Sequence, residues 1–354
     1  HYADTTLFFT HLSKTKGKKY GDWFDRIVVQ KVESVSPWVE QSYSVGYNQD
    51  KMQDKPWMSS DHHSKYEGNV YVTWTEFDKY DSHDSSDRSR IQFSYYNAEI
   101  DSFSNEITIS DTTGDCIDGD NTLEGATTAV GSNGEIIAVW AGFEKLFIDK
   151  SFDGGLTWGK DQVLAKQPEG WDMEMPNIFR ANGMPFIASN PTKNHLVVCW
   201  ADEYNGNADI WLKHSSDVGN TWSKRLRVNQ DTTQSHQYFP NIVFHQATES
   251  YFIAYWDQRH SSKNLFNDIY LAQFKIGEGI KEFRLTKKSS PLPGPTFFYG
   301  DYIDIDANDS NIAVIYPTFS AITKKSSIEL AHGKISDIAS NYPSKSSATT
   351  IEEA

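Results

Sequence analysis

Cysteine is scarce in this chain of 354 residues, and long apolar runs are missing from it. Two cysteines, Cys116 and Cys199, are too few for a disulfide framework, and neither has a second Cys or a His at zinc-finger spacing. One disulfide or two buried thiols both fit. No run approaches the roughly 18 apolar residues of a spanning helix, so we expect no membrane insertion.

Positive charge is also in short supply. Lys and Arg number 33 against 48 Asp and Glu, which gives a formal net charge of -15. Such a charge repels nucleic-acid phosphates and anionic lipids at long range, so we expect no nucleic-acid partner. What the chain does have is aromatic residues, at 14% of the total, and a charged fraction of 23%, which together indicate a folded globular protein.

The chain begins at His1 rather than Met. We therefore expect that a signal peptide has been removed and that the protein is secreted, periplasmic or at the cell surface.

An internal repeat runs through the sequence. Apolar segments ending in an aromatic residue recur with spacings of 66, 60, 56 and 60 residues between Trp74, Trp140, Trp200, Trp256 and Tyr316. One period earlier lies TLFFTHLS, residues 6–13, which makes six copies. A fixed period of this length is typical of solenoids and propellers.

Each unit contains four short segments rich in β-branched and aromatic residues, separated by polar turns. Four-stranded units at this period predict a single all-β domain over 1–354, a six-bladed β-propeller of antiparallel blades. The first unit lacks an innermost strand and the last lacks an obvious outermost strand, so we expect either that N-terminal residues have been lost or that the tail to Ala354 supplies the closing strand.

The segments KSFDGGLTWGK (150–160) and HSSDVGNTWSK (214–224) share the pattern Ser-x-Asp-x-Gly-x-Thr-Trp, and KYGDWF (19–24) is a degenerate third copy. Each full copy follows the third strand of its unit. The pattern predicts a hairpin turn in which the Asp carboxylate caps backbone N–H groups, Gly takes a positive φ and Trp packs over the loop.

This motif resembles the Asp-box, or BNR repeat, of the sialidase superfamily. The resemblance implies a six-bladed propeller with these turns on the face opposite the active site, and an activity on carbohydrate. Sialidases share three axial arginines, an Arg-Ile-Pro segment and a Tyr nucleophile activated by Glu. Here Arg-Ile-Pro is absent, Arg88 or Arg90 is a weak third arginine, and the nucleophile is expected near Tyr299 or Tyr302, so the chain resembles a divergent member.

The loops of the other face are rich in acids, amides, arginines and aromatics, which is typical of a ligand site. They include the segment 54–63, whose His62 and His63 are candidate bases, and the segment 75–90. We expect that no cofactor is required, but the segment DCIDGDNTLE (115–124) offers oxygen ligands, and Ca²⁺ is a candidate ion with Asp115, Asp118 and Asp120 as its ligands. Paired carboxylates also suit glycoside hydrolysis. The candidate catalytic residues are Asp118, Asp120, Glu124, Tyr299 and Asp301.

Two arginines of these loops, Arg180 and Arg259, could grip a carboxylate with both nitrogens, or each could neutralise a neighbouring Asp such as Asp257. The aromatic residues could stack on sugar rings or simply pack. The candidate substrate-binding residues are Arg180, Arg259, Trp171, Asp172, Glu174, Asp202, Gln237, Tyr238 and Asp257.

We therefore expect a monomeric propeller with a carbohydrate ligand and the activity of a glycoside hydrolase. Two alternatives stay open. One is a propeller that binds glycan or protein without catalysis, and the other is a polysaccharide lyase with His236 and Tyr238 as candidate bases. The acidic balance favours neutral or cationic sugars, or an anionic glycan bridged by Ca²⁺.

Overall fold

The structure is a computed structural model that describes residues 2–3, 6–17, 24–33, 41–261, 263–298 and 300–340. The chain divides into two compact units. Unit 1 comprises residues 1–166 and 191–194, and unit 2 comprises residues 167–190 and 195–354. Whether the whole chain is one domain stays a prediction.

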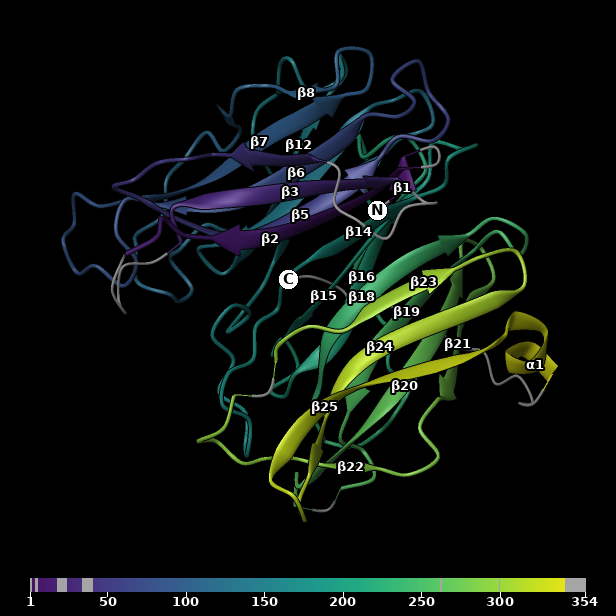
Figure 1. Cartoon of the computed structure of the whole chain (residues 1–354). Coiled ribbons are helices and arrows are strands. Elements are labelled where there is room, and N and C mark those ends of the chain that lie inside the picture. Colours follow the sequence, from purple (N-terminus) through teal and green to yellow (C-terminus); the bar gives the residue numbers. More distant parts are fainter. Residues whose placement is uncertain are drawn as a thin grey trace. The chain divides into compact units, whose positions relative to one another are not determined.

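Unit 1 contains three antiparallel sheets whose strands follow chain order (Figure 1). The first consists of β1 (Tyr2–Ala3), β2 (Thr6–Ser13), β3 (Arg26–Glu33) and β4 (Gln41–Val45). The second consists of β5 (Met52–Ser60), β6 (Val70–Phe77), β7 (Ser89–Asn97) and β8 (Ser102–Phe103), with β9 (Ile107–Thr108) also paired to β7. The third consists of β10 (Glu124–Val130), β11 (Ile136–Gly142), β12 (Lys145–Ser151) and β13 (Gln162–Lys166).

Unit 2 contains the other three sheets. The fourth sheet consists of β14 (Phe186–Ser189), β15 (Leu196–Asp202), β16 (Asp209–Ser215) and β17 (Leu226–Arg227). The fifth consists of β18 (Gln237–His245), β19 (Ser250–Asp257), β20 (Phe266–Lys275) and β21 (Gly279–Arg284), with β22 (Ser290–Pro291) paired to β20. The sixth consists of β23 (Asp304–Ala307), β24 (Asn311–Ser320) and β25 (Lys325–Lys334), and α1 (Ile335–Ser340) follows.

These six small sheets are the blades of a six-bladed all-β propeller fold, as the repeat predicted. The apolar runs that revealed the repeat are the second strands. β6, β11, β15 and β19 are buried along their full length, which explains why they read as continuous apolar segments rather than alternating ones. The sixth sheet has three strands within the described residues, while the first has four, of which β1 is only two residues long.

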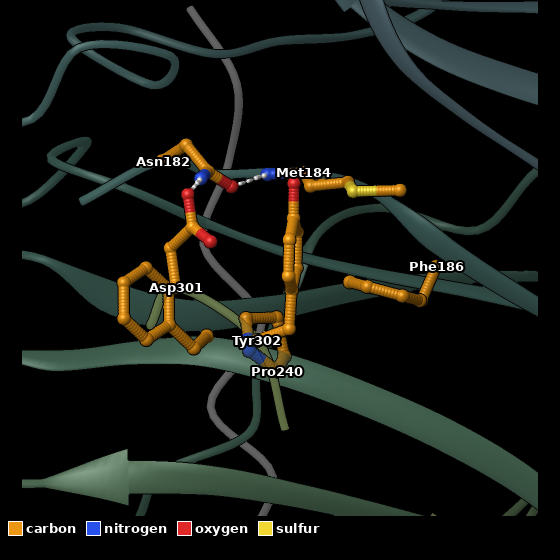
Figure 2. Close-up of a pocket in the computed structure, with 7 residues that line it drawn as sticks. Asn182, Met184, Phe186, Pro240, Asp301 and Tyr302 are labelled. Atoms are coloured by element: carbon orange, nitrogen blue, oxygen red, sulfur yellow. Dashed lines mark hydrogen bonds between the residues drawn. The ribbon is translucent and has the colours of Figure 1, made fainter. Parts of the chain in front are cut away.

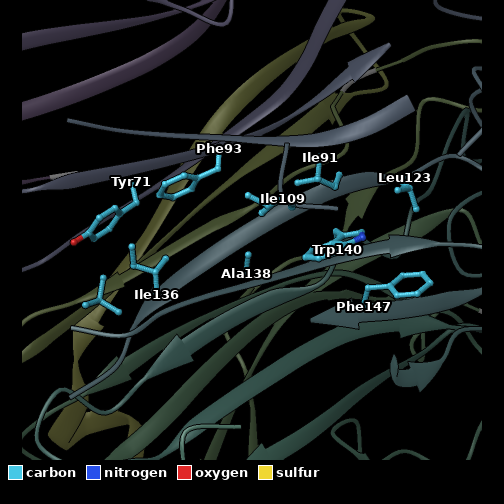
Figure 3. Close-up of a cluster of buried hydrophobic side chains, with 11 residues drawn as sticks. Tyr71, Ile91, Phe93, Ile109, Leu123, Ile136, Ala138, Trp140 and Phe147 are labelled. Atoms are coloured by element: carbon cyan, nitrogen blue, oxygen red, sulfur yellow. The ribbon is translucent and has the colours of Figure 1, made fainter. Parts of the chain in front are cut away.

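The core of unit 1 lies between blades. Aromatic and branched side chains of the second sheet, among them Tyr71, Ile91 and Phe93, pack against Ile136 and Trp140 of the third (Figure 3). Such interdigitated apolar layers contribute about 1.5–3 kcal/mol for each large side chain that is fully buried. Neighbouring blades of a unit therefore hold each other in place.

The two repeated turns have the same hydrogen bonds, as the motif predicted. In the third sheet, Oδ1 of Asp153 accepts from the backbone N of Thr157 at 2.9 Å, and in the fourth Oδ1 of Asp217 accepts from Thr221 N at 2.8 Å. Gly155 and Gly219 both take positive φ. The ring of Trp158 packs edge-on against Phe93 of the second sheet, at 4.9 Å between centroids. The degenerate copy at 19–24 lies outside the described residues except for Phe24.

Each sheet has two ends. At one, which we call the loop end, the first strand begins, the second ends and the third begins, as in the pairings Glu124 with Ala141 and Gly142 with Lys145. The repeated turns lie at the other, the turn end, since Ser151 pairs with Ile136. Within the units, first strands of successive sheets contact each other, β5 with β10, β14 with β18 and β18 with β23. Their loop ends therefore adjoin.

One loop was assigned to the wrong end from sequence. His62 and His63 were expected at the loop end as part of the segment 54–63. β5 already runs through Ser60, so both histidines fall in the turn between β5 and β6, at the turn end. There Asp61 accepts hydrogen bonds from the backbone N of His63 and Ser64.

No helix among the described residues is long and apolar enough to cross a membrane.

Candidate functional site

Two loops run side by side at the loop end of the second and third sheets. The loop 78–88 follows β6, and the loop 114–123 leads into β10. Isolated bridges join Ser82 to Cys116 and Ser89 to Gly114. The buried thiol of Cys116 packs on Met52 and Phe77 beneath them, and both cysteines of the chain are free and buried. The two loops thus form one rim at the loop end of these sheets.

A tyrosine and a carboxylate meet across these two loops. The phenol hydroxyl of Tyr80 donates a hydrogen bond to Oδ2 of Asp118, and both side chains are half-buried. Burial and the Asp118 carboxylate both raise the pKa of Tyr80, so the phenol keeps its proton at neutral pH and Asp118 is placed to accept it. The pair can therefore act as a nucleophile with its base.

A buried lysine and a buried glutamate lie behind this tyrosine and carboxylate. Nζ of Lys55 is 2.7 Å from Oε2 of Glu124, and 3.5 Å from Oδ2 of Asp54. Both residues of the pair lie at β-bulges, since the register of β5 shifts between Asp54 and Trp57 and that of β10 shifts after Glu124. Lys55 also has a positive φ of 49°. Bulges re-aim side chains, and here they bring a lysine and a glutamate of neighbouring blades together.

The carboxyl of Glu124 stays protonated to a higher pH than an ordinary glutamate. Burial raises the pKa of Glu124 to about 8, with Asp118 and Asp54 acting in the same direction and Lys55 opposing them. Its Oε1 is buried with no hydrogen-bond partner among the described residues. Raised carboxyl pKa values also occur away from this end, at Asp149 and Asp161, where burial raises both to about 6. A raised pKa by itself therefore does not identify a functional site. Glu124 is a candidate because it lies beside Tyr80 and Asp118.

The other cations at this end are paired. Arg90 donates to Glu76 at 2.8 Å and to Asp78 at 2.9 Å, and Lys51 also contacts both carboxylates. Arg88 donates through Nη1 to the backbone carbonyls of Ser85 and Asp87. Neither candidate for a third substrate arginine is thus an isolated cation.

The proposed calcium ligands lie in the loop 114–123 as expected. Oδ1 of Asp115 accepts from the backbone N of Ile117, and the carbonyl of Asp120 accepts from Phe143 N. No three His, Cys, Asp or Glu side chains are gathered as metal ligands in the part of the chain that the structure describes. Calcium binding by Asp115, Asp118 and Asp120 remains a hypothesis.

In unit 2, the structure brings together Arg180 and Asp301, two residues singled out from sequence for different roles. Nη2 of Arg180 forms an ion pair with Oδ2 of Asp301, and the guanidinium lies 5.2 Å from the centroid of Phe298. Asn182 donates to the same oxygen at 3.4 Å. Tyr299 lies outside the described residues.

Figure 2 shows the small pocket next to this ion pair. The hydrogen bonds of Asn182 to Asp301 and to the backbone N of Met184 close one side of it. The pocket has a cavity volume of about 0 Å³ for water, so it is far smaller than the roughly 300 Å³ at which small-molecule sites begin. It is lined by Asn182, Met184, Phe186, Phe239, Pro240, Asp301 and Tyr302.

Arg259 pairs with Asp257, as the second interpretation of this residue predicted. Its Nε and Nη2 donate to Oδ2 of Asp257 at 2.9 and 2.6 Å, and its Nη1 and Nη2 donate to Glu282, both at 2.6 Å. The guanidinium also lies 4.1 Å from the centroid of Tyr270. Burial raises the pKa of Asp257 to about 6, against the effect of Arg259. Two carboxylates therefore already neutralise the arginine expected to hold the substrate.

Several other candidates are buried in unit 2. Asp202 forms a fully buried ion pair with Arg225, whose Nη1 lies 3.0 and 2.8 Å from its two oxygens, and burial raises the pKa of Asp202 to about 6. Oε1 of Gln237 accepts from Asn229 at 2.7 Å, and Tyr238 is fully buried.

The last candidates differ in exposure. Trp171 is 5% exposed, whereas Asp172 and Glu174 are exposed. Burial lowers the pKa of His236, a candidate lyase base, and its Nδ1 accepts from the backbone N of Ala208 at 3.3 Å. Trp171, Tyr238 and Gln237 thus contribute to packing in this structure rather than to an open surface.

Sequence reasoning missed Tyr80 and Lys55. Both lie in loop segments that the sequence marked as polar and aromatic, Tyr80 in 75–90 and Lys55 in 54–63. The proximity of Asp118 to Glu124 was implied by their common segment. Nothing in the sequence indicated that Tyr80 and Lys55 of the second blade contact these two residues.

No protein-family model matches this chain, and no curated protein matches it by sequence. Solved structures do match. The NanB sialidase from Streptococcus pneumoniae superposes with a TM-score of 0.53 at 10% identity, over 95% of this chain and 68% of that one. The Trypanosoma rangeli sialidase in complex with sialic acid gives 0.55 at 13% identity, over 96% of this chain and 54% of that one.

An ulvan lyase of a polysaccharide lyase family, bound to a glucuronate–sulfated rhamnose unit, gives a TM-score of 0.51 at 9% identity, over 89% of this chain and 76% of that one. This chain therefore spans between about half and three quarters of the length of these proteins. At such identities the likeness establishes the fold. The chain has a sialidase-like six-bladed β-propeller fold with a divergent sequence.

Proposed function

We propose that this protein is a glycan-processing enzyme of the glycoside-hydrolase type, with its reactive groups at the loop end of the second and third sheets. The observation that carries the proposal is the hydrogen bond from the Tyr80 hydroxyl to the Asp118 carboxylate, next to the buried pair of Lys55 and Glu124. A secreted, periplasmic or cell-surface location is part of the same proposal.

The chemistry follows from these groups. As the Tyr80 oxygen bonds to the anomeric carbon, Asp118 takes the phenol proton and the glycosidic carbon–oxygen bond breaks. We assign protonation of the departing oxygen to Asp120, which belongs to the same loop as Asp118. Water then attacks the anomeric carbon, Asp118 returns its proton to Tyr80, and Asp120 recovers its proton from the water.

Lys55 and Glu124 act through electrostatics in this proposal. Because Glu124 is neutral up to about pH 8, the charge of Lys55 is not cancelled by its partner. That charge stabilises the developing phenolate of Tyr80, and the electrostatic effect of Lys55 on the pKa of Tyr80 is a lowering one. Glu124 is fully buried, so it does not touch the substrate.

The fold supports this proposal as a scaffold. Sialidases and a polysaccharide lyase share the fold, and the repeated turns resemble Asp-boxes. Fold likeness by itself does not assign an activity, because function depends on the site.

A non-catalytic binding propeller is the second candidate. It is favoured by the state of the unit 2 arginines, since Arg180 and Arg259 are both already paired with carboxylates. A lyase in which a Tyr80 phenolate acts as base, instead of as nucleophile, is tested by the same experiment.

The test is release of fluorophore from a panel of aryl glycosides, sialoside included, together with ultraviolet detection of unsaturated products from uronate polysaccharides. We expect turnover of at least one glycoside, and a loss of about 10²–10⁴-fold in Tyr80→Phe and Asp118→Asn. The matched control is Glu106→Gln, which changes an exposed carboxylate of the second blade between β8 and β9.

The other outcomes of this assay distinguish the binding propeller and the lyase from the hydrolase. Silence across the panel with wild-type protein that binds glycans favours the binding propeller. An ultraviolet product lost in Tyr80→Phe establishes a lyase instead. Repeating the assay with EDTA shows whether calcium is required.

A further inference from the structure

The sixth sheet differs from the other five at its outer edge. In each of the first five sheets, the strand that follows the third one in the chain pairs with it in antiparallel fashion, as β13 does with β12 and β17 with β16. β25 is the third strand of the sixth sheet, and among the described residues it pairs with β24 alone (Figure 1). The backbone groups of β25 that point away from β24 can therefore accept a further strand.

β25 is also more exposed than third strands elsewhere in the chain. β12 and β16 are buried over most of their length, whereas no residue of β25 is buried. Its apolar side chains Ile328 and Leu330 are 71% and 57% exposed. Natural proteins normally shorten, charge or cover a sheet edge, so a ten-residue edge strand with exposed apolar side chains is a template for pairing with another segment.

A cavity of about 540 Å³ reaches this edge. Residues 329–333 of β25 all line it, and because neighbouring residues of a strand face opposite sides, the cavity extends around the edge of the strand. No atom lies within 4 Å of the position that a Cβ on Gly333 would take. The opposite wall is apolar and comes from β24, with the side chains of Ile312, Val314 and Tyr316. The cavity can therefore hold apolar side chains of an added segment.

The lining of this cavity also carries positive charge. Lys287 and Lys288 belong to it, are exposed, and form no ion pair within the described part of the chain. Glu329, which lines it too, accepts hydrogen bonds from the hydroxyls of Tyr316 and Thr318 at 3.4 and 3.3 Å. A segment that combines apolar side chains with carboxylates therefore complements the cavity.

The described part of the chain ends beside this cavity. α1 follows β25 directly, its Ile338 lines the cavity, and the description ends at Ser340. The sequence continues with NYPSKSSATTIEEA, residues 341–354. Within it, SATTIEE (347–353) combines Thr and Ile, which favour strands, with two glutamates. Seven extended residues are enough to cover the five residues of β25 that line the cavity.

We propose that the segment 347–353 binds along the outer edge of β25 as an antiparallel strand. Ile351 enters the cavity, and the two glutamates that follow it lie near Lys287 and Lys288. The sequence left open which end of the chain completes the last blade, and the open edge, the cavity and the two lysines favour this segment. As part of the same chain it has an effective concentration on the order of mM at the edge, so a weak pairing suffices.

The direction of the segment agrees with the position of the lysines. In the first five sheets a turn at the turn end leads from the third strand to the fourth, and α1 takes the place of that turn in the sixth. A strand that starts there reaches the loop end with its last residues. Lys287 and Lys288 follow β21, whose Arg284 pairs with Tyr270 towards the loop end of the fifth sheet. The glutamates and the lysines therefore come to the same end.

Hydrogen exchange of the β25 amides tests the proposal. These amides should exchange at least about tenfold faster in Ile351→Asp, and in a chain ending at Ser340, than in the wild type. Ile351→Asp keeps the full chain, so this result does not depend on whether the shortened protein folds. The matched control is Ser344→Asp, which places the same charge outside the proposed strand and should leave exchange unchanged.

A charge exchange tests the proposed contacts with the lysines. Glu352→Lys with Glu353→Lys should speed exchange about two- to fivefold, and adding Lys287→Glu with Lys288→Glu should recover most of this protection. Lys281→Glu, which changes an exposed lysine of β21 outside the cavity, should recover none. Recovery by Lys281→Glu as well would contradict the contact.

A synthetic peptide of residues 341–354 completes the experiment. Added to the chain ending at Ser340, it should bind and restore the protection of β25, with an affinity that falls as salt is added, while a scrambled peptide should not. Equal exchange with and without the segment, or no binding of the peptide, would overturn the proposal. Protection in the wild type that depends on protein concentration would overturn it too, because the occupant would then be a second copy.

Discussion

Lys55 and Glu124 come from the first strands of two neighbouring blades, and Nζ of Lys55 lies 2.7 Å from Oε2 of Glu124 with almost no exposure to solvent. Lys55 falls within an irregularity of β5, and Glu124 pairs with Ala141 immediately before the register of β10 shifts. A buried pair of this kind links the second blade to the third and supports the loops that carry Tyr80 and Asp118.

Removing one partner of this pair should destabilise the protein strongly. Glu124→Leu leaves the ammonium of Lys55 buried without its acceptor, and leaving a buried charge without its partner costs about 3–5 kcal/mol. The double variant Lys55→Met with Glu124→Leu should recover part of this loss, because no charged group is then left buried. Chemical denaturation of the four proteins measures this coupling, and equal losses in the single and double variants would contradict it.

The same glutamate should make stability depend on pH. Because burial raises the pKa of Glu124 to about 8 in the folded protein, the folded state binds a proton that the unfolded state releases near its ordinary pKa of about 4.3. This contribution is complete below that unfolded pKa and disappears as pH rises through about 8. Comparing denaturation of wild-type protein and Glu124→Gln at several pH values should show a steeper decline in the wild type. Parallel curves would mean that Glu124 does not titrate in this range.

Arg259 should matter more to stability than to ligand binding. Its donors are occupied by Asp257 and Glu282, so Arg259→Ala leaves the buried Asp257 and the partly buried Glu282 close together without a cation. We expect a lowered melting temperature with the affinity for glycans changed less than about twofold. Arg259→Lys should recover little, because an ammonium cannot reproduce the forked contacts. A large loss of affinity in a stable Arg259→Ala protein would restore the substrate-binding role.

The stabilising effect of the repeated turns should be lost in strong acid. Hydrogen bonds from Thr221 lower the pKa of Asp217 to about 2. A lowered pKa adds stability above the ordinary value of about 3.9, and this stability is lost as pH falls through about 2. Asp217→Asn should therefore flatten the acid side of the stability profile relative to the wild type. Ser216→Ala, at the variable position of the same turn, is the control and should leave the profile unchanged.

Much of the fold followed from the sequence. The six apolar runs are six second strands, and the two Ser-x-Asp-x-Gly-x-Thr-Trp segments are turns between third and fourth strands. These features depend on local chemistry: burial on both faces gives an unbroken apolar run, and a capped turn needs its Asp and Gly at set positions. The mistake at His62 and His63 arose because a strand boundary was misplaced, and a few residues then decide to which end a loop belongs.

The candidate site was accessible from sequence only in part. The segment 115–124 was identified correctly as a chemically rich loop, and Asp118 and Glu124 lie within electrostatic reach of each other in the structure. The sequence did not indicate which side chains contact each other inside the protein. Asp202 and Arg259 looked like ligand groups in the sequence, yet their partners Arg225 and Glu282, which lie 23 residues further along the chain, engage them inside the protein.

The sequence by itself determined the repeat, the class of fold and the acidic character of the loops, because period, apolar runs and charge are properties of neighbouring residues. Only the tertiary structure decided that Tyr80 bonds to Asp118, that Lys55 is buried against Glu124 and that Arg259 is already neutralised. These contacts join different strands and blades, and no pattern along one strand encodes the distance between two side chains on separate strands.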